Sequence, residues 1–234
     1  MELPLDYETL KIIWWGLVGI LLIGFAATDG YDLGTATLLP FIARTDRERR
    51  LVINAIAPTW EGHQVWLITG GGALFAGWPF VYAISFSGFY LAMFVVLAAL
   101  SLRPVGFKYR SKLESPKWRS SWDWALFVGG AVPALIFGVA LGNVLQGVPF
   151  SIDSTLRASY EGGLLGLLNP FGLLAGLVSV AMLVMHGAAY LGTKIEHGTV
   201  LDRAITVGRW AAVAMMALYA VAGVWLALGV AGFR

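Results

Sequence analysis

The chain has 234 residues, of which 58% are hydrophobic and only 13% are charged. A soluble domain carries about 25% charged residues, and several apolar runs here approach the roughly 20 residues that cross a bilayer, so the composition predicts a polytopic membrane protein. The net charge of +2 is too small to indicate a nucleic-acid partner, and the absence of cysteine excludes disulfides, thiolate metal sites and thiol nucleophiles.

An acidic segment, with Glu2, Asp6 and Glu8, precedes the first apolar run. This is the reverse of the basic start of a signal peptide, so we expect that run to remain in the protein as a spanning helix. We predict six spans in all, each helical because open strands cannot satisfy their backbone hydrogen bonds in lipid. The first begins near Leu10 and includes 12–27, and the others cover about 51–78, 80–102, 122–145, 169–190 and 205–230.

Local signals mark several features of these helices. Thr45 and Glu48 have the spacing of a capping box, and Asn169 before a proline is typical of a helix start. Pro58 and Pro133 fall inside predicted spans, so we expect kinks there, and 78–79 reads as a tight turn. Two glycine pairs have the GxxxG spacing that lets helices approach closely: Gly138/Gly142 and Gly172/Gly176.

Basic residues concentrate in alternate loops, which sets the expected orientation. The loops between spans one and two, three and four, and five and six hold most of them, whereas the loop at 150–163 has only Arg157. The positive-inside rule therefore predicts an outer N-terminus and three cytoplasmic loops. The residues in those three loops are Arg44, Arg47, Arg49, Arg50, Arg103, Lys108, Arg110, Lys112, Lys117, Arg119, Lys194, Arg203 and Arg209.

The first two predicted spans hold three carboxylates, and an ionisable group at membrane depth costs roughly 2.5–3.5 kcal/mol on insertion scales. Asp29 and Asp32 share one face of the first helix, about 28 and 33 Å along it from Leu10 and thus near the cytoplasmic boundary. Glu61 lies past Arg50 in the second span, about 16 Å inward from the same side, where we expect it to be buried. If the two helices are adjacent, the acids form a ladder from Asp32 through Asp29 to Glu61 near mid-membrane.

Two interpretations of this ladder remain open. Acids and histidines in spanning segments mark proton relays, which favours a proton path from the cytoplasm. The axial gap of about 10 Å between Asp29 and Glu61 would then need waters or polar side chains to bridge it. Alternatively, the carboxylates are interfacial groups that face water or pair with arginines.

The histidines suggest a second function, a b-type cytochrome in which His63 and His186 ligate one haem. Counting residues places His63 about 19 Å from the inner face and His186 about 25 Å from the outer face, so their depths differ by more than about 10 Å and a shared haem is not expected.

The third histidine, His197, lies in a predicted cytoplasmic loop. Arg103 either snorkels toward water or pairs with an acid. No phosphate loop, zinc-binding helix or nucleophile elbow occurs in the sequence.

Several stretches closely resemble subunit II of bacterial cytochrome bd quinol oxidases, in order, over essentially the whole chain. The most specific lie at 25–34, 54–66, 86–90, 102–107, 142–149 and 169–176. They read FAATDGYDLG, NAIAPTWEGHQVW, FSGFY, LRPVGF, GNVLQGVP and NPFGLLAG.

The resemblance implies a heterodimeric oxidase of the bacterial cytoplasmic (inner) membrane that passes electrons from quinol to oxygen. Subunit I then holds the quinol site, two haems b and one haem d, whereas this chain binds no haem or metal and supplies no catalytic residue. Some members of the family hold a structural quinone. The expected partners are subunit I, membrane lipids and small single-helix subunits. No nucleic-acid partner is expected. The family pattern implies a proton path at Asp29, Asp32 and Glu61, with supporting residues Trp60, Arg103, Gln64 and His63.

Family members usually have eight spans in two four-helix halves, whereas this chain stops after six. Either the chain is naturally short or split, or it lacks the last two helices. We expect an all-α membrane bundle in which 1–145 form a four-helix bundle, 146–168 an outer loop, and 169–234 two helices of a second, incomplete bundle. The alternatives are a self-contained b-type membrane cytochrome and a proton-coupled transporter.

Overall fold

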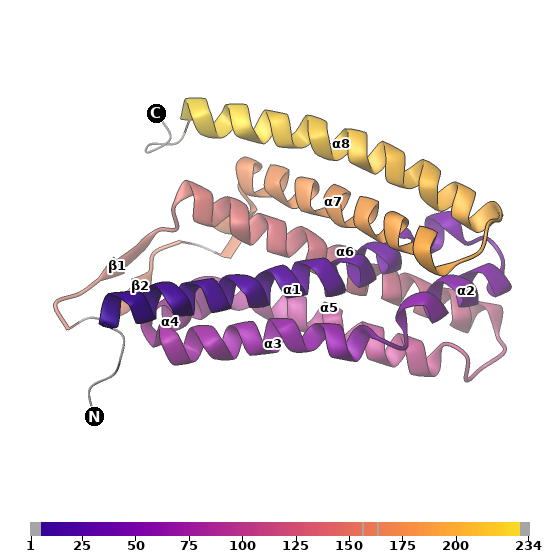
Figure 1. Ribbon diagram of the computed structural model, residues 1–234, viewed down its shortest axis with the longest axis horizontal. Helices are drawn as coiled ribbons and strands as arrows, with labels where there is room; N and C mark the ends of the chain where they lie inside the picture. The colour runs from indigo at the N-terminus through magenta and orange to yellow at the C-terminus, as the bar shows by residue number, and fades with distance from the viewer. Residues whose placement is uncertain (1–5, 156, 163, 230–234) are drawn as a thin grey trace.

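The computed structural model describes residues 6–155, 157–162 and 164–229. Within them the chain is a helix bundle with one short hairpin, which confirms the predicted all-α fold class (Figure 1). Glu2, Gly163 and Val230, which belong to predicted segments, lie outside these residues. The elements are α1 (Tyr7–Ile42), α2 (Asp46–Ile56), α3 (Trp60–Gly77), α4 (Pro79–Gly88), α5 (Tyr90–Tyr109), α6 (Pro116–Gln146), β1 (Phe150–Ile152), β2 (Ala158–Tyr160), the 3₁₀ helix η1 (Leu164–Leu168), α7 (Pro170–Lys194) and α8 (Thr199–Gly229).

Five of the described helices are long and apolar enough to cross a membrane, namely α1, α5, α6, α7 and α8. The structure divides two of the predicted spans, because 51–78 covers the second half of α2 and all of α3, and 80–102 covers most of α4 and the first part of α5. The turn at 78–79 is confirmed, with Pro79 at the first position of α4. The count of six spans stays a prediction.

α1 is the helix around which the others pack. It has 36 residues and a length of about 54 Å, and it contacts α3, α6 and α7. Every residue from 29 to 39 is buried except Tyr31, whereas the first half exposes large apolar side chains such as Ile12 and Ile23. Gly34 of α1 and Gly187 of α7 let the two backbones touch, since a Cβ at either position would collide with the backbone of the other helix.

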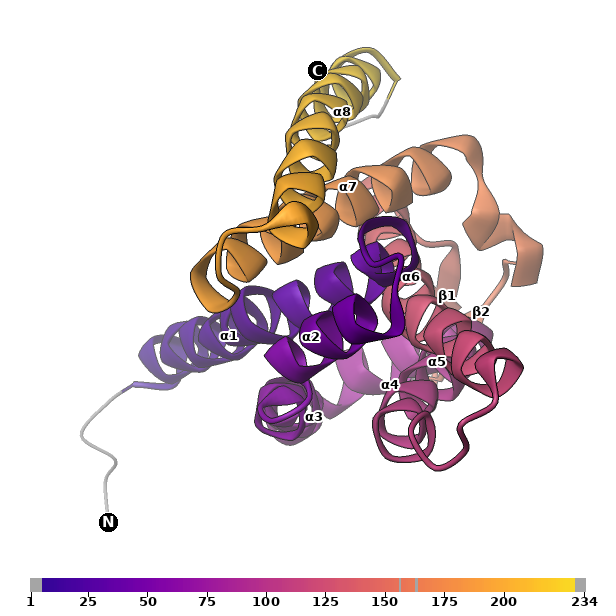
Figure 2. The same ribbon diagram turned by 90° about the vertical axis from the view of Figure 1, so that its right-hand side faces the viewer.

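α2 lies at the end of the bundle rather than continuing into α3 (Figure 2). Its Val52 and Ile53 pack in one buried cluster with Ile42 of α1 and Leu191 of α7. The chain then turns at 57–59, because Pro58 has no N–H to continue the helical ladder. The kink predicted at Pro58 is thus a complete break, whereas α6 continues through Pro133.

The two predicted glycine pairs pack against each other and join α6 to α7. A Cβ on Gly138 would meet the backbone of Ala175, and one on Gly142 would meet the Cα of Gly172. The close approach therefore depends on the absence of side chains at these positions. The packing expected from the GxxxG spacing is confirmed.

The connection from α6 to α7 contains an antiparallel hairpin that the sequence reading missed. β1 pairs with β2 with Phe150 opposite Tyr160. Beyond the hairpin, Asn169 caps α7 as predicted, since its Oδ1 accepts from the N–H of Gly172 at 2.7 Å. Its Nδ2 also donates to Oδ1 of the buried Asn143 at 2.8 Å, which ties the start of α7 to the end of α6.

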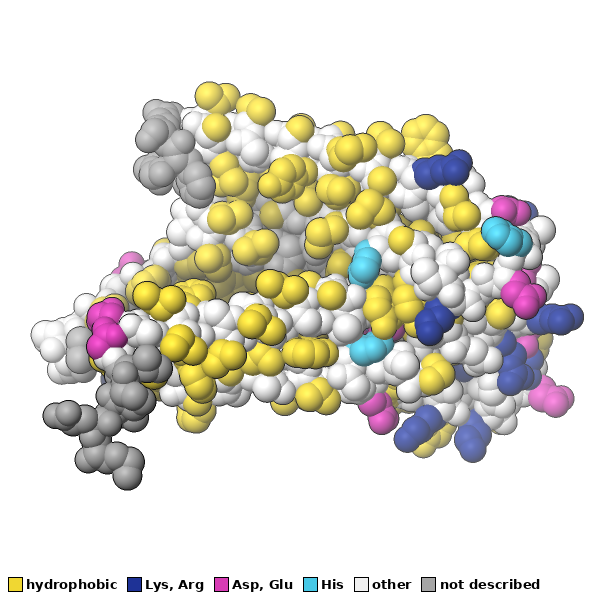
Figure 3. Space-filling view, in the orientation of Figure 1, with side chains coloured by type: hydrophobic (Ala, Val, Ile, Leu, Met, Phe, Trp, Pro, Cys, Tyr) yellow, Lys and Arg dark blue, Asp and Glu magenta, His cyan; other side chains and the backbone are white. Residues whose placement is uncertain are grey.

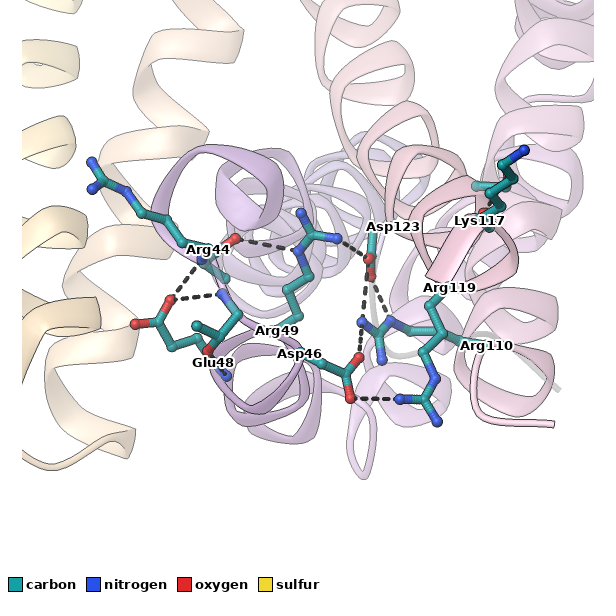
Figure 4. Close-up of polar contacts among 11 residues, drawn as sticks. Arg44, Asp46, Glu48, Arg49, Arg110, Lys117, Arg119 and Asp123 are labelled. Atoms are coloured by element: carbon teal, nitrogen blue, oxygen red, sulfur yellow. Dashed lines mark hydrogen bonds and ion pairs between the residues drawn. The ribbon is translucent and has the colours of Figure 1, made fainter. Parts of the chain in front are cut away.

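An ion-pair network holds α2 against α5 and α6, and Figure 4 shows its members pointing toward one another. Asp123 of α6 is buried and accepts from Arg49 at 2.8 Å and from Arg110 at 2.5 Å. Arg110 also donates to Asp46 at 2.9 Å, as does Arg119. The network joins residues that lie more than 70 positions apart in the chain, so it fixes where α2 sits.

The start of α2 carries the predicted capping box. The N–H of Glu48 donates to the Thr45 hydroxyl, and the Glu48 carboxylate accepts from the N–H groups of Thr45 and Arg44. Arg203 of α8 also donates to Glu48 at 3.1 Å.

On the face shown in Figure 3, Lys and Arg side chains gather at the end of the molecule where α2 lies, and apolar side chains cover most of the rest. The distribution agrees with the positive-inside pattern, and the orientation itself stays a prediction.

We predict that Asp123→Asn lowers the free energy of unfolding by about 3–5 kcal/mol, because it leaves Arg49 and the buried Arg110 without their carboxylate. The control is Arg119→Gln, which removes a pair whose side chains are 25% and 41% exposed and should cost about 0–1 kcal/mol. Thermal unfolding in detergent, followed by circular dichroism, measures both. Equal losses in the two variants would contradict a buried network centred on Asp123.

A second prediction concerns pH. The pKa of Glu48 is lowered to about 2 by the N–H of Arg44, the Arg203 guanidinium and the N–H of Thr45. A carboxyl group with a lowered folded-state pKa stabilises the fold above its unfolded pKa and loses that contribution as the pH falls through the folded value. We therefore expect Glu48→Gln to unfold at a lower temperature than the wild type at pH 7. The difference should close between about pH 4.5 and pH 2, and a difference that stays constant with pH would contradict the assignment.

Candidate functional site

Asp29 and Arg103 form an ion pair between α1 and α5, and both side chains are wholly buried. The Arg103 Nη1 and Nη2 each lie 2.9 Å from Asp29 Oδ1, and Nη2 lies 3.0 Å from Oδ2. Gly129 of α6 leaves room beside the arginine stem, since a Cβ there would meet Arg103 Cγ. Pairing of Arg103 with an acid is thus confirmed and snorkelling is wrong.

Asp32 lies one turn further along α1, is also wholly buried, and has a titratable partner. Its Oδ2 lies 2.7 Å from Nδ1 of His63 on α3, and the other ring nitrogen, Nε2, lies 3.2 Å from the Tyr31 hydroxyl. The second carboxylate oxygen, Oδ1, has no hydrogen-bond partner among the described residues. His63, expected only as a supporting residue, therefore directly contacts Asp32, one of the carboxylates of the predicted path.

Tyr31 and Tyr190 join this site to α7, and the sequence reading did not single out either residue. Their rings stack with centroids 3.8 Å apart and planes 11° from parallel. The Tyr190 hydroxyl donates to the carbonyl of Ala55 at 3.0 Å, which connects α7 to the end of α2. The one available signal was the position of Tyr31 between two aspartates in an apolar helix.

The predicted difference in depth between His63 and His186 is wrong. Both imidazoles pack against the Tyr31 ring, with centroids at 5.3 and 5.7 Å from it. The residue count failed because α2 and α3 do not form one straight helix. His186 Nε2 pairs with the carbonyl of Ala27 at 2.9 Å, and both nitrogens of His63 are engaged. The two side chains are therefore arranged about a tyrosine and not about a common metal position.

Glu61 lies in the first turn of α3 and is exposed on this chain, so the predicted burial is wrong. His63 is level with Asp32 and α3 runs antiparallel to α1, so Glu61 lies two residues nearer the α2 end. From that end the order is Glu61, Asp32 and then Asp29, which corrects the predicted ladder. Glu61 makes no hydrogen bond or ion pair with the other described residues.

The remaining predicted residues lie on α3. Trp60 packs against Phe107 of α5 with ring centroids 5.9 Å apart. Gln64 is half-buried one residue past His63. The roles of the site residues in proton transfer stay predictions.

The described residues contain no group of three or more His, Cys, Asp or Glu side chains that could hold a metal ion. A cavity of about 840 Å³ lies between α1, α6, α7 and α8. Its lining is almost entirely apolar and includes Phe25, Phe137, Phe171, Met182 and Tyr219. The cavity suits a long apolar molecule rather than a polar or charged one.

Comparisons with known proteins agree with the sequence pattern. Residues 10–233 match the family model of cytochrome bd terminal oxidase subunit II. The chain is 56% identical to cytochrome bd-I ubiquinol oxidase subunit 2 of Escherichia coli (strain K12) over 229 residues, which are 98% of this chain and 60% of that protein. It is 56% identical to probable cytochrome oxidase subunit 2 of Haemophilus influenzae over 95% of this chain and 58% of that protein.

A more distant relative is cytochrome bd ubiquinol oxidase subunit 2 of Bacillus subtilis. That protein is 34% identical over 183 residues, which cover 78% of this chain and 53% of the relative. The chain therefore spans between about half and three fifths of the length of these relatives.

The buried Asp29–Arg103 pair leads to a stability prediction. Asp29→Asn leaves the Arg103 charge buried and unpaired, so we expect the free energy of unfolding to fall by about 3–5 kcal/mol. The double variant Asp29→Leu/Arg103→Met removes both charges and should recover most of this loss, because an apolar pair needs no compensation in the interior. Thermal unfolding in detergent compares the three proteins. A double variant as unstable as Asp29→Asn would show that the unpaired charge is not the cause.

Proposed function

Since the chain belongs to the cytochrome bd terminal oxidase subunit II family, we propose that it serves as the haem-free subunit of a bd-type quinol oxidase. The complex oxidises quinol and reduces oxygen to water. Its haems, two b-type and one d-type, and its quinol site belong to the partner, subunit I. This chain is a non-catalytic scaffold that also contributes a proton path, and small single-helix subunits and lipids complete the assembly.

The observation that carries the proton path is the row of titratable groups at the basic end of the bundle. Glu61 lies nearest that end, the Asp32–His63 pair is next, and the Asp29–Arg103 pair is deepest. Buried acids in a membrane protein are costly and are retained where protons or ions move. In this proposal Asp29, Asp32 and Glu61 line the route, with Arg103, His63, Trp60 and Gln64 holding them in place.

The surroundings of Glu61 support a path that continues into the partner. Val65, Ile68 and Phe75 lie on the same face of α3 as Glu61 at helical spacing, and their exposed fractions are 54%, 72% and 59%. An exposed apolar stripe of this kind is covered by lipid or by another subunit. Subunit I covers it in this proposal, so that Glu61 lies where the two chains meet.

The charge distribution sets the direction of proton flow. The basic end, with α2 and the loops around it, faces the cytoplasm, and the N-terminus lies outside the bacterial inner membrane. Protons then enter from the cytoplasm while quinol is oxidised near the outer face, so that turnover separates charge across the membrane.

The apolar cavity fits the structural quinone found in some family members. Its volume of about 840 Å³ and its apolar lining suit an isoprenoid tail. When bound there, the quinone would add apolar packing between α1, α6, α7 and α8. The chain's own residues would hold it by side-chain contact, chiefly with Phe25, Phe137 and Met182.

We predict that Glu61→Gln slows quinol-dependent oxygen consumption by the purified complex, because the amide cannot carry a proton, and that Glu61→Asp retains part of the rate. The control is Glu161→Gln, because Glu161 is an exposed carboxylate next to β2 of the hairpin, far from Glu61. Its rate of oxygen consumption should match that of the wild type. Haem absorbance and copurification of subunit I establish that each complex is assembled. Wild-type turnover in an assembled Glu61→Gln complex would remove Glu61 from the path.

A further inference from the structure

The two buried aspartates of α1 have partners of different chemistry. Asp29 is paired with Arg103, whose guanidinium keeps its proton at any pH that a protein experiences. Asp32 is paired with His63, whose imidazole can carry a proton on either ring nitrogen. One ion pair is thus permanent, whereas the other can share a single proton between an oxygen and a nitrogen.

His63 also connects the surface of α3 to the interior of the bundle. Its side chain is 16% exposed, whereas that of Asp32 is wholly buried. Glu61 and His63 are two residues apart on α3 and therefore point to different faces of the helix, and Glu61 itself is exposed. A proton that reaches the imidazole can pass to Asp32, because Nδ1 contacts the carboxylate while Nε2, next to the Tyr31 hydroxyl, can take up the incoming proton.

We propose that His63 and Asp32 form the proton-carrying pair of this chain, and that Asp29 stays ionised against Arg103 and only stabilises the charge beside it. The proposal rests on the oxidase function proposed above and revises its path at two positions, since His63 becomes a proton carrier and Asp29 becomes a supporting residue. Tyr31 positions the imidazole through its hydrogen bond to Nε2, and its stack on Tyr190 holds the tyrosine ring in place.

With Asp32 ionised, Nδ1–H of His63 donates to Oδ2 and Nε2 accepts from the Tyr31 hydroxyl. A proton from the α3 surface binds Nε2, the Nδ1–H bond breaks, and its proton moves to Asp32 Oδ2. The result is a neutral carboxyl group and a neutral imidazole that now donates from Nε2 to the Tyr31 oxygen. Oδ1 of the same carboxyl group has no partner among the described residues and can pass the proton on after rotation of the carboxyl group.

The Asp32–His63 pair is surrounded by other charged and titratable groups, which lie on α1, α3, α5 and α7. Glu61 lies on α3 itself, and the other groups belong to neighbouring helices. They are Asp29 and Tyr31 on α1, Arg103 on α5, and His186 and Tyr190 on α7. His186 is a useful matched control, because it also packs against Tyr31 but pairs with a backbone carbonyl and not with a carboxylate.

The experiment compares His63→Gln and His186→Asn in the purified complex. In the wild type, we expect turnover to fall as the pH rises, because fewer protons then reach the Asp32–His63 pair. His63→Gln should lower turnover at least about tenfold and flatten this dependence; positioned acid–base groups are worth about 10²–10⁴-fold, and water can replace part of that. His186→Asn should keep the wild-type dependence. An assembled His63→Gln complex with the pH profile and rate of His186→Asn would overturn the proposal.

A second measurement does not depend on oxidase activity. Infrared difference spectra of the resting complex report the carbonyl band of a protonated carboxyl group, and Asp32→Asn identifies the band of Asp32. In the wild type this band should grow as the pH falls, whereas in His63→Gln, which loses the hydrogen bond that favours the carboxylate, it should persist to higher pH. A band with the same pH dependence in both proteins would overturn the proposal. Absence of quinol oxidase turnover in the wild type would instead contradict the proposed function and leave this readout intact.

Discussion

Charge inside an apolar bundle must be compensated by a partner on another helix, and this constraint organises the molecule. α1 carries two buried carboxylates one turn apart, and neither pairs with a cation of its own helix. Arg103 of α5 compensates the first and His63 of α3 the second. Because each contact requires a short distance between side chains, the two pairs fix the positions of α3 and α5 relative to α1. The buried second half of α1 then forms the core.

The same constraint acts at the basic end with a different result. Asp123 is buried and pairs with both Arg49 and Arg110. Arg49 belongs to α2 itself, and Arg110 also pairs with Asp46 in the first turn of α2. The network holds α2 at the end of the bundle, so that α3 begins only at Trp60. Glu61 is consequently in the first turn of α3, close to the basic end and exposed. The location of this acid follows from an ion-pair network to which it does not belong.

Features that depend on neighbouring residues could be predicted from the sequence. The capping box at Thr45, the cap at Asn169 and the glycine pairs of α6 and α7 all involve local spacing, and the structure confirms them. Asp29 and Asp32 were correctly placed on one helix. The pairing of Arg103 with an acid was one of two open alternatives, and the choice depended on a glycine of α6 more than twenty residues away in the chain. The predicted positions of Glu61 and His63 relative to the residues of α1 and α7 were wrong, because counting residues assumes one straight helix from Arg50 onward. In the structure α2 ends just before Pro58, and α3 begins after it.

The network that holds α2 also constrains the order in which the protein can be completed. Asp46 is made early in synthesis, but its partners Arg110 and Arg119 and the adjacent Asp123 follow more than 60 residues later. Until those residues have entered the growing structure, the arginines near the start of α2 have no buried carboxylate to bind. The Arg49–Asp123 contact that holds α2 can therefore form only after α6 has been made, and the Tyr31–Tyr190 stack beside the Asp32–His63 pair can form only after α7 has been made. The site is assembled late, although the residues that form its first contacts are among the earliest to be made.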